Sequence, residues 1–359
     1  SVVSLTLNAP TLEDTMPDNE RLVRALRSAT GKDTVDLTYF VIKKLPDTLR
    51  DNNFEIKCVL KTTGDKVKVL DVIGGGEEDV ACGLAVDIGT TTVSALLLNM
   101  LDGKILAKAS SGNAQIRYGA DVINRIIQTT KEGGIKKLQD AIVKETLNPI
   151  IQNMCQSINM DYHRIYGMCV AANTTMNHLF MGVNADYLRQ EPFIPVFFEE
   201  DCCLGEDLDL LINPSAGIII APNIGSYVGG DITAGTLASM IWNSDEFSLF
   251  IDLGTNGELV FGNRDFLMSC ACSAGPAFEG GDISCGMRAT DGAIESITID
   301  KETMEPTYSV IGETKPVGLC GSGIIDIISE LYLTGIINSK GKFVREGKRV
   351  KCDDFGIHS

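Results

Sequence analysis

The chain has 359 residues, of which 44% are hydrophobic and 22% are charged, the balance of a globular protein with a sizeable core. Its net charge is −17, so it repels nucleic acid and anionic membranes, and we expect neither as a partner. No apolar run reaches the roughly 18 residues of a membrane span, so we expect neither a membrane span nor a signal peptide. Eleven cysteines, many of them in apolar runs, are typical of reduced thiols, so we expect a cytoplasmic protein.

The first 80 residues are expected to form a small α+β domain of their own. The elements predicted here are a strand at 1–8, a helix beginning near Asp18, a helix over 36–50 that Pro46 interrupts, and a hairpin over 54–62 and 66–73. The run 74–79 is rich in glycine and acidic residues and predicts a linker, which puts the boundary near residue 80. This segment carries no catalytic constellation, and we interpret it as a spacer or docking domain.

An apolar strand then delivers Asp87 to a turn. The turn consists of Gly89, Thr90, Thr91 and Thr92, and a second apolar strand follows it. Glycine lets backbone N–H groups approach an anion, threonine hydroxyls donate to it, and aspartate holds a hydrated metal ion. The pattern therefore predicts a phosphate-binding hairpin, although an ordinary hairpin turn has a similar composition.

The middle of the chain alternates predicted helices and buried strands. These are a helix over 133–158, a strand over 165–171, a short helix over 176–181, a strand over 216–221 and a helix over 232–242. His178 lies in the short helix, where a packed histidine is favoured over a ligand.

A second hairpin repeats the arrangement of the first. An apolar strand over 247–253 carries Asp252 to Gly254, Thr255, Asn256 and Gly257, and another strand follows. The two aspartates are 165 positions apart (252 − 87). We therefore expect a duplicated domain with a cleft between its halves, each half directing a carboxylate and a Gly/Thr turn at one polyphosphate.

A third segment opens a helix with small residues. Strands are predicted over 293–300 and 308–311, and a helix over 320–336 begins with Gly321, Ser322 and Gly323. Residues this small let a flat base and a ribose lie close to the backbone.

The three segments 87–92, 252–258 and 318–326 resemble the phosphate-1, phosphate-2 and adenosine motifs of the actin, hexokinase and heat-shock-70 superfamily. The resemblance implies an α/β fold in which a duplicated ribonuclease H-like ATPase domain covers residues 81–359. Its first lobe would span about 81–245 and its second would begin near 246. The superfamily's second connecting helix has no match after residue 336, so we expect the second lobe to be truncated.

The resemblance also implies roles in binding ATP and Mg²⁺. Asp87 and Asp252 would be catalytic carboxylates that hold Mg²⁺ through water. Asp231 opens the helix that matches the superfamily's first connecting helix and would position the attacking water; a plain N-cap aspartate is the alternative. The phosphates would be bound by Gly89, Thr90, Thr91, Thr92, Gly254, Thr255, Asn256 and Gly257, and the nucleoside by Gly321, Ser322 and Gly323.

A finer pattern resembles one branch of this superfamily, the reductive activators of corrinoid proteins. The segments that carry the resemblance are 113–115, 118–126, 172–178, 228–232, 252–258 and 273–280. The family implies that ATP drives reduction of a Co(II) corrinoid to Co(I) on the corrinoid protein of a methyltransferase system. The loop 269–280 would face this partner through Ser273 and Glu279; a packing loop is the alternative.

In that family a 2Fe-2S domain at the N-terminus supplies the electron. The plant-type spacing of its four cluster cysteines is absent here, so we expect the cluster only in a domain upstream of this chain. Three other functions stay open: an activator of 2-hydroxyacyl-CoA dehydratases, a small-molecule kinase of the same fold, and a nucleotide-sensing module. A homodimer is also open.

Overall fold

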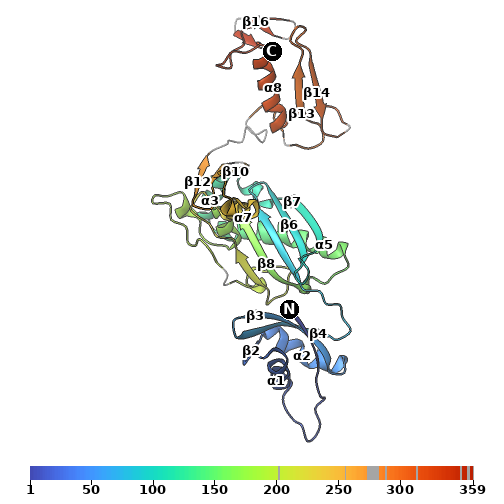
Figure 1. Ribbon diagram of the computed structural model, residues 1–359. Coiled ribbons are helices and arrows are strands. Elements are labelled where there is room, and N and C mark those ends of the chain that lie inside the picture. The colour runs from blue at the N-terminus through green and yellow to red at the C-terminus, as the bar shows by residue number, and fades with distance from the viewer. Residues whose placement is uncertain are drawn as a thin grey trace. The chain divides into compact units, whose positions relative to one another are not determined.

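The computed structural model describes residues 1–200, 203–254, 256–272, 283–287, 289–312, 314–347, 350–353 and 356–358. The chain forms two compact units, Ser1–Asn243 and Ser244–Ser359. Figure 1 shows the helices and strands of both. Both are mixed α/β structures, as the sequence predicts. Within the described residues, no helix is long and apolar enough to cross a membrane.

We call the first part of this unit, residues 1–80, the N-terminal domain. It is built on a four-stranded sheet in the order β1-β3-β4-β2. Its elements are β1 (Val2–Thr6), α1 (Asp18–Thr30), β2 (Thr34–Leu37), α2 (Tyr39–Asp51), β3 (Glu55–Thr63) and β4 (Lys66–Gly74). Strand β2 is parallel to β4, and the other pairs are antiparallel. Leu22 and Leu26 of α1 and Leu45 and Leu49 of α2 are buried in one core with one face of the sheet.

The prediction for the second helix is wrong in two respects, its first residue and the interruption at Pro46. Residues 34–37 are a strand, because β4 offers a free edge with which they pair in parallel. The helix begins after Thr38, whose hydroxyl accepts from the Val41 N–H, and it runs through Pro46 without a break. Proline in a helix leaves the carbonyl four residues earlier without its donor. That residue is Ile42, whose side chain is 41% exposed, so water has access to this turn of the helix.

The rest of the first unit, which we call the first lobe (residues 82–243), is built on a five-stranded sheet in the order β7-β6-β5-β8-β9. Its strands are β5 (Cys82–Ile88), β6 (Thr92–Asn99), β7 (Ile105–Gly112), β8 (Ile165–Ala172) and β9 (Gly217–Ile220). Strands β5, β8 and β9 pair in parallel, whereas β6 pairs antiparallel with both β5 and β7. The helices are α3 (Val122–Thr129), α4 (Gly134–Ile142), α5 (Asn148–Ser157), α6 (Thr174–Phe180) and α7 (Gly230–Ser239).

The helix predicted over 133–158 is divided into α4 and α5 by a π-helical turn at Val143–Leu147. Pro149 follows this turn and has no N–H for the Glu145 carbonyl, with which its ring would also clash in a regular helix. The wider π turn accommodates the proline, so the chain continues in the same direction. Leu138, Ile142, Leu147 and Ile151 all lie in the lobe's core.

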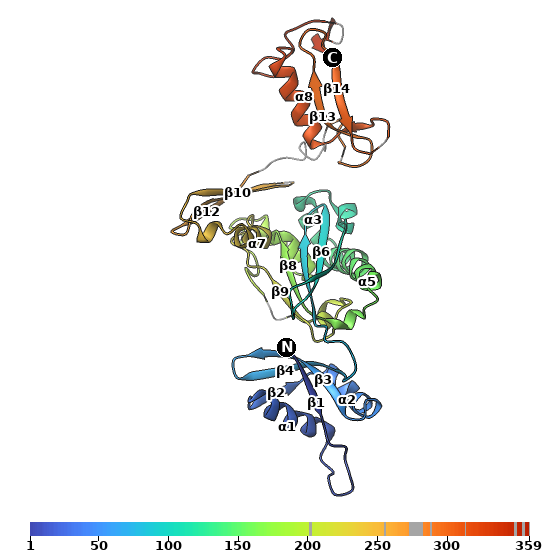
Figure 2. The ribbon, with the colours of Figure 1, turned by 45° about the vertical axis from the view of Figure 1, so that its right-hand side comes forward.

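The second face of the N-terminal sheet packs on the first lobe. Val59 and Leu70 form a small buried cluster with Ala81 and Tyr166. Strand β8 carries one extra residue at Tyr166, because Cys82 and Gly83 of β5 pair with Ile165 and Gly167. A bulge of this kind re-aims the side chain of the extra residue. Figure 2 shows the strands of the N-terminal sheet between its two helices and the first lobe.

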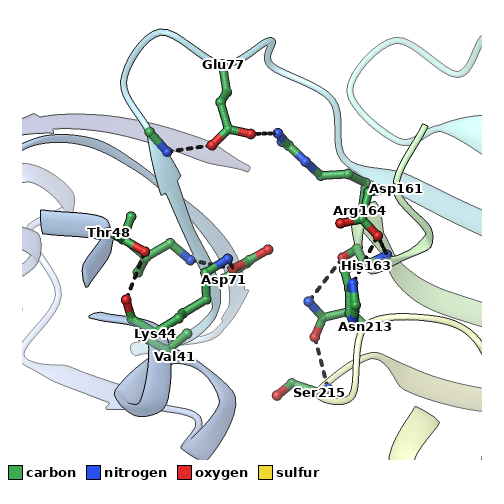
Figure 3. Close-up of polar contacts among 12 residues, drawn as sticks. Val41, Lys44, Thr48, Asp71, Glu77, Asp161, His163, Arg164, Asn213 and Ser215 are labelled. Atoms are coloured by element: carbon green, nitrogen blue, oxygen red, sulfur yellow. Dashed lines mark hydrogen bonds and ion pairs between the residues drawn. The ribbon is translucent and has the colours of Figure 1, made fainter. Parts of the chain in front are cut away.

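Polar contacts accompany this apolar interface. The Tyr166 hydroxyl donates to Asp71 Oδ2 (2.9 Å), and Lys44 Nζ donates to Asp71 Oδ1 (2.7 Å). Glu77 accepts from the Gly74 N–H and pairs with Arg164 of the first lobe (Figure 3). The Asp71 side chain is 2% exposed, so a carboxylate buried between the two domains is shared by a lysine and a tyrosine.

In its described residues, the second unit has three small sheets. The first consists of β10 (Ser248–Leu253), β11 (Gly257–Gly262) and β12 (Leu267–Cys272). The second has the order β14-β13-β15, from β13 (Ala293–Ile299), β14 (Pro306–Val310) and β15 (Gly318–Leu319), and α8 (Gly321–Leu333) packs against β13. Strands β16 (Lys351–Asp353) and β17 (Gly356–His358) form a hairpin.

Candidate nucleotide site

The hairpin that was predicted to bind phosphate consists of β5 and β6, and we call its turn, residues 89–91, the phosphate-1 turn. Asp87 is exposed, whereas its neighbours Val86 and Ile88 are buried in the core, so the alternation of the strand turns the carboxylate outward. The strand ends at Ile88, and Gly89, Thr90 and Thr91 form the turn. The structure thus presents one carboxylate beside a glycine-threonine turn.

The carbonyl oxygens of this turn are held by the segment that follows β7. Asn113 donates from its side chain to Gly89 O (2.9 Å) and from its backbone to Thr91 O (2.8 Å), and Arg125 donates to Thr90 O (2.6 Å). In a trans peptide the N–H points opposite to the C=O, so the N–H groups of Thr90 and Thr91 face away from these donors. In the part of the chain that the structure describes, neither N–H donates a hydrogen bond. Backbone N–H groups held in this way suit an anion.

Asn173, at the end of β8, contacts the same turn. Its Oδ1 accepts from the Met176 N–H and caps α6, and its Nδ2 lies 3.4 Å from Thr90 Oγ1. Asn113 similarly caps a 3₁₀ turn by accepting from the Gln115 N–H. Asparagine side chains before two helices therefore do two things, since each caps a helix and positions the turn.

Helix α7 begins close to this turn. A Cβ on Gly229 would lie 2.4 Å from Asn173 Cα, and one on Gly230 would lie 2.5 Å from Ala221 O, so only glycine permits this approach. Asn223 accepts from the Gly230 N–H (3.0 Å) and from Asn177 Nδ2 (2.9 Å), which ties the helix start to α6.

Asp231 is in the first turn of α7. The N-cap is Gly229, so the alternative of a plain N-cap aspartate is wrong. The side chain of Asp231 is half-buried and accepts from the Ile232 N–H (2.9 Å). Asp231 thus places a carboxylate at the start of α7, which packs on β8, and it belongs with the other candidate residues of the first lobe.

His178 is a structural residue, as predicted. Its Nδ1 lies 2.7 Å from Thr174 O, and its Nε2 accepts from the Val196 N–H (2.9 Å), which fixes the neutral form with the proton on Nδ1. The ring stacks on Phe197, and burial lowers its pKa. Both nitrogens are thus used inside the lobe.

The phosphate-2 hairpin lies in the second unit. Asp252 pairs with Glu258 across β10 and β11, and the Gly254 N–H donates to Asn256 O (2.9 Å) in the turn between them. Thr255 lies outside the described residues. Gly257 begins β11 and is buried.

The start of α8 was predicted to contact a nucleoside. Ser322 is exposed and Gly321 is half-buried, but Gly323 is buried, and a Cβ on it would lie 2.2 Å from Ile294 O. Gly323 is therefore explained by the close packing of α8 on β13. Asp326 and Glu330 of α8 accept from the Ile297 and Ile299 N–H groups and strengthen that packing.

Ser273 and Glu279 lie outside the described residues. Within the described part of the chain, no group of three or more His, Cys, Asp or Glu side chains could hold a metal ion. A hydrated Mg²⁺ needs only one or two carboxylates besides the phosphates, so Asp87 fits this ion, whereas the described cysteines do not form an iron-sulfur site.

Comparison with known families and proteins identifies the chain. Consecutive segments match three family models: the RACo linker region (residues 1–79), the RACo middle region (residues 82–244) and the C-terminal domain of RACo, the ASKHA domain (residues 246–358). The chain belongs to the RACo family.

Individual relatives agree with this assignment. The corrinoid activation enzyme RamQ of Eubacterium limosum is 38% identical over 281 residues, which are 77% of this chain and 46% of RamQ. A [Co(II) methylated amine-specific corrinoid protein] reductase of Methanosarcina barkeri is 25% identical over 71% of this chain and 51% of its own length. The solved structure of a reductive activator for corrinoid, iron-sulfur protein has a TM-score of 0.81 and 39% identity, covering 99% of this chain and 57% of that one. The chain thus spans about half the length of its relatives.

Proposed function

We propose that this RACo-family chain belongs to an ATP-dependent activator that reduces a Co(II) corrinoid to Co(I) on a corrinoid protein that serves a methyltransferase. The observation that carries the proposal is the 38% identity with the corrinoid activation enzyme RamQ. The name of the Methanosarcina relative describes the same class of reaction, a reduction acting on a Co(II) corrinoid protein. The anion-binding geometry of the phosphate-1 turn supports ATP as the second substrate.

The reaction couples one electron transfer to hydrolysis. Co(II) takes up one electron from a low-potential donor and becomes Co(I), while ATP and water yield ADP and phosphate. For a one-electron couple roughly 59 mV corresponds to about 1.4 kcal/mol, so an uphill gap of a few hundred millivolts costs several kcal/mol. ATP binding and turnover would offset this cost by changing the affinity for the corrinoid protein in its two oxidation states. The coupling is reciprocal, so each ligand alters the other's binding.

The residues divide this work between the two units. The Thr90 and Thr91 N–H groups and hydroxyls bind phosphate oxygens in the first lobe, with Gly89 and Thr92 flanking them. Asp231 orients the attacking water. The matching hairpin in the second unit contributes Gly254, Thr255, Asn256 and Gly257 to the phosphates, and Gly321 and Ser322 contact the nucleoside, with Gly323 letting α8 lie close to β13.

Mg²⁺, held through water by Asp87 and Asp252, would neutralise phosphate charge. We propose that the electron donor is a 2Fe-2S domain of the same activator. We also propose that Ser273 and Glu279 face the corrinoid protein.

Absorbance of cob(I)alamin tests this function. The full chain is mixed with a Co(II) corrinoid protein and a low-potential reductant, with ATP, with ADP or without nucleotide. We expect Co(I) to form only in the mixture that contains ATP. ATP hydrolysis without Co(I), across several corrinoid proteins, would replace this proposal with a kinase or a nucleotide sensor.

A further inference from the structure

Arg125 is fully buried in the first lobe. It lies in α3, and its guanidinium donates to four acceptors from three other segments. These are Thr90 O (2.6 Å), Gly119 O (2.9 Å), Gln115 Oε1 (3.3 Å) and Met176 Sδ (3.3 Å). The side chain therefore joins the phosphate-1 turn to the segment before α3 and to α6.

Among the residues that the structure describes, no carboxylate forms an ion pair with Arg125. Asp121, the N-cap residue of α3, favours its charge from beyond ion-pair distance. Burial lowers the pKa of Arg125 to about 10, which is well above neutral pH, so the guanidinium stays charged. A buried charge without a directly paired counterion costs several kcal/mol. A structural link alone would not need this charge, because a neutral amide also donates to a carbonyl.

The contact with Thr90 O places the charge where an anion would benefit. The Thr90 carbonyl and the Thr91 N–H belong to one peptide group and point in opposite directions. A cation on the carbonyl polarises the whole group, so the N–H on the other side becomes a stronger donor. Arg125 thus acts on an anion through the peptide group, without contacting it.

Two buried residues in the segment before α3 support this arrangement. Gln115 accepts from Arg125 and donates to Leu138 O (2.9 Å), which fixes the guanidinium relative to α4. Asn113 holds the carbonyls of Gly89 and Thr91. Asn113 and Gln115 are 2% and 0% exposed, so both are structural parts of the turn's support.

We propose that Arg125 is a positioning residue that holds the phosphate-1 turn in its anion-binding form and gives it a positive potential for a di- or triphosphate. The inference rests on the proposed function, because the ligand is the phosphate chain of a nucleotide. It adds a residue that does not touch the ligand and whose contribution is specific to the ligand's charge.

The test compares charged and uncharged ligands by calorimetry. Arg125→Met keeps an unbranched side chain but removes the charge and the four hydrogen bonds. We expect it to weaken binding of ATP, ADP and inorganic tripolyphosphate about tenfold or more, equivalent to about 1.4 kcal/mol, and to leave adenosine binding within a factor of two. Arg117→Met is the matched control: Arg117 lies eight positions earlier and pairs with Glu145 on the surface (2.6 Å), so all affinities should be those of the wild type.

Each result decides the inference. A folded Arg125→Met protein that binds ATP as the wild type does, or that loses adenosine in the same proportion as ATP, would overturn it. If Arg125→Met does not fold, Arg125→Gln, whose neutral amide still donates to a carbonyl but carries no charge, must show the selective loss; wild-type affinity for ATP in this variant would overturn the inference. If the wild-type protein binds tripolyphosphate but not ATP, and this binding depends on Arg125, the proposed function is refuted and the inference is supported. A wild-type chain that binds neither would refute both.

Discussion

Asp87 is the exposed carboxylate beside the phosphate-1 turn, and its proposed role is testable with one amide. We expect Asp87→Asn to lower ATP hydrolysis by roughly a hundredfold or more, the loss typical when a group that stabilises charge in a transition state is removed. The measurement is phosphate release by the full chain at saturating ATP. Asp102→Asn, in the exposed turn after β6, is the control and should keep the wild-type rate. Undiminished hydrolysis by Asp87→Asn would remove Asp87 from the site.

His178 gives a prediction about pH. Because burial lowers its pKa in the folded state, the unfolded chain binds a proton near the ordinary pKa of about 6.5 while the folded chain does not. This residue's contribution to stability is therefore fully present above pH 6.5 and is lost as the pH falls toward the lowered pKa. The slope is at most about 1.4 kcal/mol per pH unit.

Urea unfolding between pH 7.5 and 5.5 measures this slope. His178→Gln, which does not titrate, should show a shallower fall in the free energy of unfolding than the wild type, even if it is less stable at pH 7.5. Equal slopes in the two proteins would mean that His178 takes up its proton in the folded state.

At the scale of elements, the approach of α7 to β8 depends on Gly229. A Cβ there would overlap Asn173 Cα at 2.4 Å and Ala172 O at 2.5 Å, so the backbone must move. We expect Gly229→Ala to cost about 1–3 kcal/mol of stability, as overpacking does, and to lower ATP hydrolysis by displacing Asp231. Gly225→Ala is the control in the same loop, because a Cβ on Gly225 meets nothing within 4 Å. A Gly229→Ala protein with wild-type stability and hydrolysis would contradict the close packing.

The elements that sequence predicts best here are those with a strong local signal. The hairpin strands beside Asp87 and Asp252 have continuous apolar runs, and both were predicted within a residue or two of β5 and β10. Strand β2 was missed because four residues pair only through the edge of β4. The π-helical turn at 143–147 could not be predicted from the local sequence, because it depends on the tertiary context that keeps α4 and α5 aligned.

The support of the phosphate-1 turn could not be predicted in the same way. The motif containing Asn113 and Arg125 was noted in the sequence, but its function depends on contacts with residues 24 and 35 positions away. Local patterns carry no information about which distant carbonyl a side chain reaches. The one usable signal is an asparagine directly before a helix, which predicts the cap at Asn173 but not its second contact, and the cap at Asn113 is known only from the structure.

For the molecule as a whole, the N-terminal domain and the first lobe share a buried carboxylate. Burial beside Asp71 raises the pKa of Tyr166, so its hydroxyl stays protonated and donates. Tyr166→Phe leaves Asp71 Oδ2 without this donor, which we expect to cost about 1–3 kcal/mol. Hydrogen exchange should then increase in both β4 and β8, since both border the contact.

Tyr39→Phe is the control for this prediction, because Tyr39 is 74% exposed. It should leave exchange in β4 and β8 unchanged. Faster exchange in β8 alone after Tyr166→Phe would mean that the N-terminal domain does not depend on the lobe for its stability.

The bulge at Tyr166 has a consequence for how this pair of domains tolerates change in length. Ile165 and Met168 both reach the lobe's core, and the extra position between them lets Tyr166 leave that core for the other domain. A chain with Tyr166 deleted would have an uninterrupted ladder between β5 and β8 and an unchanged turn at Asn173, but no hydroxyl for Asp71. The first lobe would still have its own sheet and core. The one extra residue in β8 is therefore what distinguishes a lobe that folds without a partner from a lobe that holds the N-terminal domain in a fixed position.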